Sequence, residues 1–405
     1  MPEAVIVAAA RSPIGRAGKG SLRDVRPDDL AVQILEAALA QVPQLDPRDI
    51  EDLFLGCGSP AGSSGYNLAR VVAVLAGLDR LPGTTVNRYC ASSVQTTRMA
   101  LHAIRAGEGD VFVSAGVETV SQYAAGRSDG GPGTKNPRFE RAETRSGEVA
   151  AGRRPWTDPR HDGELPDVYL QMGQTAENVA RLTGVSREEQ DAFAVRSQNR
   201  AEAAVADGFW SREITPVTLP DGTVVSRDDG PRAGVTLERV AALEPVFRPD
   251  GTVTAANCCG VNDGAAALVV MSDVKARRLG ITPLARVVST GVSALSPETM
   301  GLGPVEASRR ALALAGLTID DIDLVEINEA FAAQVIPSAR ELGIDEDRLN
   351  VHGGAIAVGH PFGMTGARIT TTLLNSLRHD DGQFGLETMC VAGGQGMALV
   401  LERLS

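Results

Sequence analysis

Aromatic residues, excess basic charge and long apolar runs are all scarce in this chain of 405 residues. Only 4% of the residues are aromatic, so the interior must be built mainly from Ala, Val, Leu and Ile. Acidic residues outnumber basic ones by 51 to 39, and the net charge of −12 argues against a nucleic-acid partner, which needs a basic footprint. No run reaches the roughly 18 apolar residues of a membrane span, so we expect no membrane partner.

Cysteine is also sparse. The five cysteines, at positions 57, 90, 258, 259 and 390, are odd in number and irregularly spaced, which is a poor disulfide framework. The first residues lack the pattern of a secretory signal, so we expect a reducing cytoplasm, where free thiols are available for chemistry. No cysteine or histidine pair has metal-ligand spacing, and segments 15–21 and 56–62 fail as nucleotide motifs. We therefore expect no metal and no permanently bound cofactor.

Short Val- and Ile-rich runs alternate with Ala- and Leu-rich helical patterns. The sequence predicts strands at Val5–Ala10, Leu53–Gly56 and Val111–Val117 and helices at Leu30–Leu39 and Val94–Ile104. Strands that alternate with helices indicate an α/β fold, and we expect a parallel sheet of the βαβ type.

The two halves of the chain resemble each other. Residues 31–56 match 307–327, where a helix leads through an acidic turn into a strand. The next unit also recurs: the strand and turn at 84–91 and the following helix match 349–366 and its helix. Because the two matches keep the same order, we expect a duplication, with a site where the halves meet.

The segment 121–168 differs from both halves, because it is rich in Gly, Arg and Pro and has little periodicity. Seven bases lie within 135–160, against four acids. These are Lys135, Arg138, Arg141, Arg145, Arg153, Arg154 and Arg160. One interpretation is a solvated surface or subunit contact, and the other is a lid or a patch that steers phosphates. Helical patterns resume at Met172–Leu182 and Glu188–Gly208.

Two motifs combine reactive side chains with small neighbours. In VNRYCASS, Cys90 lies between an extended run and a helix, where unpaired N–H groups and the helix dipole favour the thiolate. In GHPFGMTG, Pro361 biases His360 away from helical geometry, which suits a base or a hydrogen-bond donor. A buried structural cysteine and a turn histidine are the alternatives.

Two further motifs lie near the C-terminus. Cys390, in ETMCVAGGQG, ends a strand before a glycine-rich bend whose N–H groups can line a cavity, although a core cysteine is the alternative. Asn328, in NEAFA, follows the strand LVEI, where an asparagine is usually a cap.

Taken together, these four motifs resemble those of the thiolase family, the acetyl-CoA C-acyltransferases, over essentially the full chain. The stretches NCCGVNDGAAA at 257–267 and QMGQTAENVA at 171–180 add to the resemblance. It implies duplicated βαβαβ halves in a layered α/β/α/β/α body with an inserted loop domain. The expected parts are residues 1–120, completed by about 262–283; 121–261, the loop domain that binds CoA; and 284–405.

The resemblance also implies a ping-pong acyl transfer. Cys90 would be acylated while His360 takes its proton, and Cys390 would shuttle the second proton. One set of oxyanion donors would be His360 and a water held by Asn328, and the other the backbone N–H groups of Cys90 and Ala392. Ala392 stands where the family usually has Gly, and it fits if its φ stays negative.

The same resemblance implies contacts to coenzyme A, which is a substrate here. Arg232 would meet a nucleotide phosphate, Phe247 and Met172 would flank the pantetheine arm, and Met300 would lie near the acyl pocket. Cys259 stands, with Cys258, in place of a common Ala-Ser pair, and it is a weaker donor than Ser.

Several alternatives stay open for the activity. The first interpretation is acetyl-CoA C-acetyltransferase, and the second is a degradative 3-ketoacyl-CoA thiolase for longer or branched chains, because Gln171 replaces a histidine typical of acetoacetyl-specific members. A remote alternative is an inactive protein that binds acyl-CoA. We expect a homodimer or homotetramer in fatty-acid metabolism.

Overall fold

The architecture rests on one long mixed sheet in the computed structural model, which describes residues 1–405. Its strands follow one another in the order β10-β11-β12-β9-β1-β8-β5-β3-β4, with the short β2 (Gly15–Arg16) beside β8. The first half of the chain contributes β1 (Ala4–Arg11), β3 (Asp52–Gly56), β4 (Gly83–Val86), β5 (Val111–Thr119) and β8 (Asn262–Ser272). The second half contributes β9 (Ala285–Ala294), β10 (Leu324–Ile327), β11 (Phe384–Val391) and β12 (Gln395–Arg403).

The expectation of a parallel sheet is wrong for most of the strand pairs. Strand β3 runs parallel to β4 and β5, and β10 runs parallel to β11, but every other pair is antiparallel. For β11 and β12 the reason is their connection, because a tight turn joins them without a crossover helix and strands joined in this way run antiparallel.

The expected duplication is visible in the strand order. When the strands of each half are numbered along the chain, the first half has the spatial order 3-2-4-5-1. In the second half, Leu349 forms an isolated parallel bridge to Val325 of β10, at the edge of the sheet. If this bridge is counted in place of a third strand, the second half has the same order, 3-2-4-5-1. The half-sheets meet where Val5 and Ile6 of β1 pair with Arg286 and Ala285 of β9.

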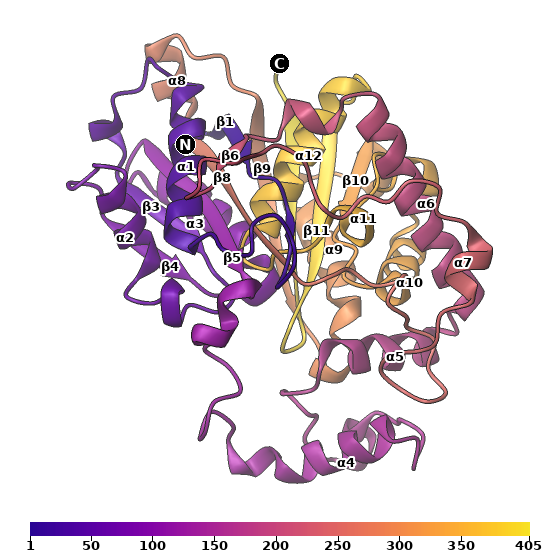
Figure 1. The fold of residues 1–405 in the computed structure, drawn as a ribbon. Coiled ribbons are helices and arrows are strands. Elements are labelled where there is room, and N and C mark those ends of the chain that lie inside the picture. The colour runs from indigo at the N-terminus through magenta and orange to yellow at the C-terminus, as the bar shows by residue number, and fades with distance from the viewer.

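Successive side chains of a strand point to opposite faces of the sheet, and the apolar ones pack with helices into three large core clusters. Helices therefore cover both faces of each half-sheet, which gives the expected α/β/α/β/α order (Figure 1). One outer layer, with α8 (Asp273–Leu279) at its margin, contains α1 (Pro27–Ala40) and α2 (Leu68–Leu75). The other outer layer contains α9 (Gly303–Ala315) and α10 (Ala332–Leu342). Between the half-sheets lie α3 (Ser92–Ala106) and α12 (Thr365–His379), preceded by the short α11 (Ala355–Val358).

The two central helices approach closely where both begin. A side chain added at Gly366 of α12 would place its Cβ 2.4 Å from the backbone nitrogen of Val94 in α3. The N–H of Ala367 donates to Ser93 Oγ at 2.9 Å. The segments that precede the two helices, one with Cys90 and the other with His360, are therefore brought to the same place between the half-sheets.

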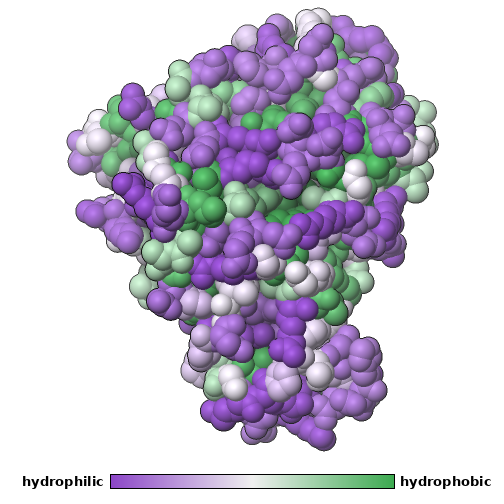
Figure 2. Space-filling model, turned by 90° about the vertical axis from the view of Figure 1, so that its right-hand side faces the viewer, coloured by the Kyte–Doolittle hydropathy of each residue, from purple (hydrophilic) through white to green (hydrophobic).

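The insertion between β5 and β8 contains the two helices expected at Met172–Leu182 and Glu188–Gly208, and it also contains a helix within 121–168, where the sequence showed little periodicity. It holds two short strands and four helices: β6 (Val217–Thr218), β7 (Val224–Val225), α4 (Glu140–Ala150), α5 (Met172–Thr183), α6 (Arg187–Ala206) and α7 (Leu237–Ala241). Helix α4 stands away from the layers, and its lobe has a mainly hydrophilic surface (Figures 1 and 2). No helix is long and apolar enough to traverse a bilayer.

Acidic neighbours neutralise much of the basic segment 135–160. Four of its seven bases form ion pairs, namely Lys135 with Glu143, Arg141 with Glu164, Arg154 with Glu148, and Arg145 with both Glu164 and Glu298. Arg145 is buried, so it is neither a solvated surface residue nor free to steer phosphates.

Candidate active site

Cys90 lies in the turn between β4 and α3, in the 3-10 segment Tyr89–Ala91. Ser92 ties the turn together, because its Oγ accepts the Arg88 N–H at 2.9 Å and donates to the Tyr89 carbonyl at 2.6 Å. Tyr89 adopts a positive φ of 45°, which is uncommon for a residue with a side chain and marks a sharply bent backbone. The sequence folds this way because small residues follow the cysteine and begin the helix.

The expected thiolate at Cys90 is wrong for the free protein. Burial raises the pKa of the Cys90 thiol to about 12, and the nearby carboxylate of Glu118 adds to the effect. The backbone N–H groups of Cys90 and Ala392 act in the opposite direction and favour the thiolate. One donor lies in the turn before α3 and the other in the bend after β11, but the desolvation of the sulfur outweighs both.

His360 is held on three sides and is almost fully buried, with 1% of its surface exposed. Its backbone N–H donates to Asn262 Oδ1 at 2.9 Å. Its Nδ1 lies 2.6 Å from Thr365 Oγ1, and this hydroxyl donates to the Pro361 carbonyl at 2.7 Å. With the hydroxyl proton assigned to that carbonyl, we place the ring proton on Nδ1, from which it is donated to Thr365.

The other ring nitrogen of His360, Nε2, therefore carries the lone pair that can accept a proton. Its Nε2 lies 3.2 Å from Asn328 Nδ2. Burial lowers the pKa of His360 to about 3, and the positive charge of Arg368 acts in the same direction. The resting imidazole is neutral, with a lone pair on the nitrogen that faces Asn328.

The Asn328 backbone connects this histidine to the second cysteine motif. Asn328 follows β10, and its N–H donates to the Thr388 carbonyl of β11 at 3.0 Å. Cys390 lies two residues further along β11, with 1% of its surface exposed. Burial, and next the nearby Cys90, raise the pKa of the Cys390 thiol.

The glycine-rich bend after Cys390 fits the alanine found there. Ala392 keeps a negative φ, whereas Gly393 and Gly394 take the positive values, 79° and 80°. The Ala392 N–H influences the Cys90 thiol directly. The two cysteine motifs, 300 residues apart in the chain, therefore converge on one point.

A small apolar cluster adjoins the thiols. Cys390 and Met300 are buried in it, and Met172, Phe247 and Cys259 pack against it. The Phe247 ring covers the start of α5 so closely that a Cβ at Gly173 would lie 2.3 Å from it. Four of the five residues expected to contact CoA therefore lie together beside Cys390.

Cys259 brings a third thiol to this place. Its N–H donates to the Ala330 carbonyl at 3.1 Å, just after Asn328. Burial raises its pKa, and Cys258, Cys90 and Cys390 contribute further, in that order.

Arg232, the fifth of those residues, lines a cleft of about 490 Å³. Three other basic residues, Arg16, Lys19 and Arg239, line the same cleft. Asn262 and Gly359, which adjoin His360, form part of its wall, as does Cys258. The cleft therefore extends from a basic surface to the residues around His360.

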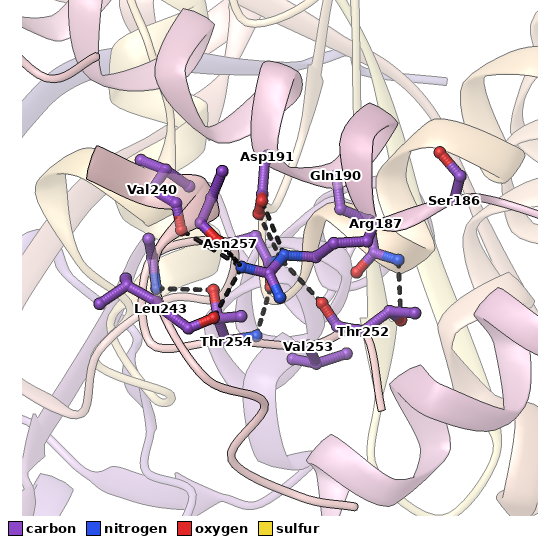
Figure 3. A network of polar contacts seen from close by, with 12 residues as sticks. Ser186, Arg187, Gln190, Asp191, Val240, Leu243, Thr252, Val253, Thr254 and Asn257 are labelled. Carbon is purple, nitrogen blue, oxygen red and sulfur yellow. Dashed lines mark hydrogen bonds and ion pairs between the residues drawn. The ribbon is translucent and has the colours of Figure 1, made fainter. Parts of the chain in front are cut away.

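A polar network holds the rim of this cleft in place (Figure 3). Arg187 at the start of α6 pairs with Asp191 at 2.6 Å, and its Nη2 donates to carbonyl groups around the end of α7. Asp191 in turn accepts from Asn257 Nδ2 at 2.9 Å. Asn257 Oδ1 accepts the Thr254 N–H at 2.8 Å, so the segment that leads to Cys258 is fixed against α6.

Sequence reasoning assigned no role to three residues that position these groups. Thr365 and Asn262 orient His360. Glu118, fully buried, accepts from the Gly363 N–H of the His360 loop at 2.8 Å and from Tyr123 Oη at 2.8 Å. A signal was present for Thr365, which follows His360 by five residues in its motif.

Comparisons with known proteins agree with these motifs and this fold. The models of the thiolase N-terminal and C-terminal domains match residues 4–274 and 281–403. A 3-ketoacyl-CoA thiolase of Bacillus subtilis is 43% identical over 99% of this chain and 100% of its own length. A 3-oxoadipyl-CoA/3-oxo-5,6-dehydrosuberyl-CoA thiolase of Escherichia coli is 42% identical over the full length of both.

The fold comparison points the same way. The crystal structure of an acetyl-CoA acetyltransferase of Bacillus anthracis superposes with a TM-score of 0.86 and 37% identity, covering 100% of this chain and 99% of that one. The chain therefore belongs to the thiolase family and is an acyltransferase of the thiolase type, as its motifs predicted.

Proposed function

We propose that the chain converts a 3-ketoacyl-CoA and CoA reversibly into a shortened acyl-CoA and acetyl-CoA through an acyl group on Cys90. The observation that carries the proposal is that two thiols, Cys90 and Cys390, lie near each other, while Asn328 joins His360 to the strand that holds Cys390. A thioester hydrolase needs one nucleophile, a base and an oxyanion site, but it has no use for a second thiol. The second thiol therefore favours the making and breaking of carbon–carbon bonds.

In the first half-reaction, Cys90 Sγ attacks the 3-keto carbon and His360 Nε2 takes the thiol proton. The bond between C2 and C3 then breaks, and its electron pair stays on C2 of the departing acetyl-CoA. Cys390 donates its proton to that carbon and is left as a thiolate. Because burial holds Cys90 and Cys390 as neutral thiols, both protons are in place before the reaction begins.

In the second half-reaction, CoA replaces acetyl-CoA at the same site. The Cys390 thiolate takes the proton of the CoA thiol, and the CoA sulfur attacks the acyl group on Cys90. The Cys90 sulfur leaves and recovers its proton from His360. Each group returns to its starting state, so the cycle needs no metal or bound cofactor for its proton balance.

The negative charge on the two substrate oxygens needs separate donors. We assign one site to the backbone N–H groups of Cys90 and Ala392, which already favour negative charge on Cys90 Sγ. The second is His360 Nε2, once protonated, with a water held by Asn328. The Asn328 Oδ1 atom is buried without a protein partner, which supports a water at that position.

The cleft and the apolar cluster suit the two ends of coenzyme A. Arg232 would contact a phosphate near the surface, and Met172 and Phe247 would flank the pantetheine arm, with Cys259 close to its inner end. Met300 would adjoin the acyl group, because it is buried in the cluster that contains Cys390.

For the substrate range, we favour 3-ketoacyl groups longer than acetoacetyl. This preference is supported by relatives that are 41–43% identical over 99–100% of the chain and are named 3-ketoacyl-CoA or β-ketoadipyl-CoA thiolases. The second candidate is acetyl-CoA C-acetyltransferase, and the Bacillus anthracis structure supports it. We further propose a cytoplasmic homodimer or homotetramer in fatty-acid metabolism. An inactive binding protein is disfavoured because Cys90, His360 and Cys390 are all present.

The decisive test is Cys390→Ala, assayed for each step separately. We expect the variant to acquire an acyl group on Cys90 from an acyl-CoA, seen as a mass increase of the intact protein, yet to lose thiolysis of 3-ketoacyl-CoA. Cys90→Ser should lose the adduct, and Cys57→Ala is the control for a buried cysteine outside the cluster. Full thiolysis by Cys390→Ala would refute the assignment.

A panel of 3-ketoacyl-CoA substrates of increasing chain length then separates the two candidates. Higher kcat/KM for the longer substrates supports the degradative thiolase. Activity confined to acetoacetyl-CoA supports the acetyltransferase.

A further inference from the structure

One short segment joins the insertion to the apolar cluster beside the thiols. This is the 3-10 segment η8 (Pro297–Leu302), which carries both Glu298 and Met300. Met300 is buried with Cys390, and Glu298 has only 1% of its surface exposed. Between them, Thr299 leaves helical geometry, with φ −128° and ψ 30°. The chain is therefore kinked between the residue that faces the insertion and the residue that faces the cluster.

Three donors from the insertion surround the Glu298 carboxylate. Arg145 Nη2 lies 2.9 Å from Oε1, the Asp167 N–H donates to Oε1 at 2.8 Å, and Trp156 Nε1 donates to Oε2 at 2.7 Å. These donors are 153, 131 and 142 residues away in sequence. A buried carboxylate with three donors is a strong link, because its charge is satisfied only in this arrangement.

The donors are themselves held in place. Arg145 Nη1 pairs with Glu164 at 2.8 Å, and its Nη2 also donates to the Leu165 carbonyl at 2.8 Å. From α5, Asn178 Nδ2 donates to the Glu298 carbonyl at 2.9 Å. The side chain and the backbone of Glu298 are therefore fixed by two different parts of the insertion, the arm around α4 and the helix α5.

We propose that Glu298 is a positioning residue for acyl-chain selection, through which the arm around α4 sets the place of Met300 and hence the depth of the acyl pocket. The proposal rests on the acyl-pocket role suggested above for Met300. Glu298 touches no reacting atom, so the chemistry at Cys90 should not depend on it. The fit of longer chains should depend on it, since a methylene-sized change in an apolar pocket alters kcat/KM by about tenfold or more.

The test is Glu298→Gln, which keeps the shape of the side chain but removes its charge. We expect kcat/KM to fall about tenfold for longer 3-ketoacyl-CoA substrates, mainly through KM, and to stay within about threefold for acetoacetyl-CoA. The matched control is Glu164→Gln, which removes the other carboxylate on Arg145 without touching η8. It should keep the wild-type chain-length profile.

Two further measurements keep the test decisive. If Glu298→Gln does not fold, Trp156→Phe removes a single donor to Glu298 and should shift the profile in the same direction. Hydrogen exchange of residues 297–302 should increase in either variant. An unchanged profile, or an equal loss for every chain length, overturns the role of Glu298. A wild-type protein without activity on longer chains refutes the proposed substrate range instead.

Discussion

The hydroxyl of Thr365 offers the sharpest test of how His360 is prepared as a base. Thr365→Val keeps the shape of the side chain but removes the oxygen that lies 2.6 Å from His360 Nδ1. Both residues are buried, with 0% and 1% of their surfaces exposed, so water cannot replace the lost acceptor. The Nδ1 proton then has no partner.

The expected magnitude follows from this burial. A buried donor without a partner costs about 1–3 kcal/mol. The imidazole can escape the cost by moving its proton to Nε2, but Nε2 can then no longer accept the thiol proton of Cys90. Since 1.4 kcal/mol corresponds to about a factor of ten, we expect acylation of Cys90 to slow by roughly 5- to 150-fold.

The assay is rapid-quench acylation of Cys90 by an acyl-CoA, followed by intact-protein mass spectrometry. Thr365→Ser retains the hydroxyl and should acylate at nearly the wild-type rate. Thr371→Val is the control for a threonine-to-valine change on the same helix, because its hydroxyl bonds only to the Ala367 carbonyl. If Thr365→Val acylates as fast as the wild type, or if Thr365→Ser is equally slow, the hydroxyl does not orient His360.

Three further predictions concern charge and packing. Burial raises the pKa of Glu387 from 4.5 to about 8, so the native state keeps a proton that the unfolded state loses, and the free energy of unfolding should fall as pH rises across this window. Glu387→Gln should remove this part of the fall, measured by urea unfolding at pH 5 and 8; an equal pH dependence in both proteins would contradict it. Gly366→Ala should lower the free energy of unfolding by about 1–3 kcal/mol, because its Cβ meets the Val94 backbone, whereas Gly147→Ala, in open space on α4, should raise it by about 0.5–1 kcal/mol. Because burial raises the pKa of Cys90 to about 12, alkylation of Cys90 by iodoacetamide should accelerate about tenfold per pH unit up to pH 9, and a plateau below pH 8 would show a thiolate instead.

Local pattern was sufficient for several elements and for the reactive residues of this protein. The run at Val5–Ala10 became β1, and the helical pattern at Val94–Ile104 became α3, because apolar spacing and helix signals act over a few residues. The recurrence of 31–56 in 307–327 likewise predicted the duplication, which the strand order shows. The four motifs around Cys90, Asn328, His360 and Cys390 predicted the family, because each combines a reactive side chain with the small neighbours that its turn requires.

Tertiary structure alone decided how those residues behave. The antiparallel pairs depend on which strands meet, and the charge state of Cys90 depends on how much water the fold removes from its sulfur. The link between Arg145 and Glu298 joins side chains 153 residues apart, and nothing near either one in the sequence marks its partner. Propensity and motif spacing are short-range properties of the chain, whereas desolvation and ion pairing are set by whatever the folded chain brings within a few ångströms.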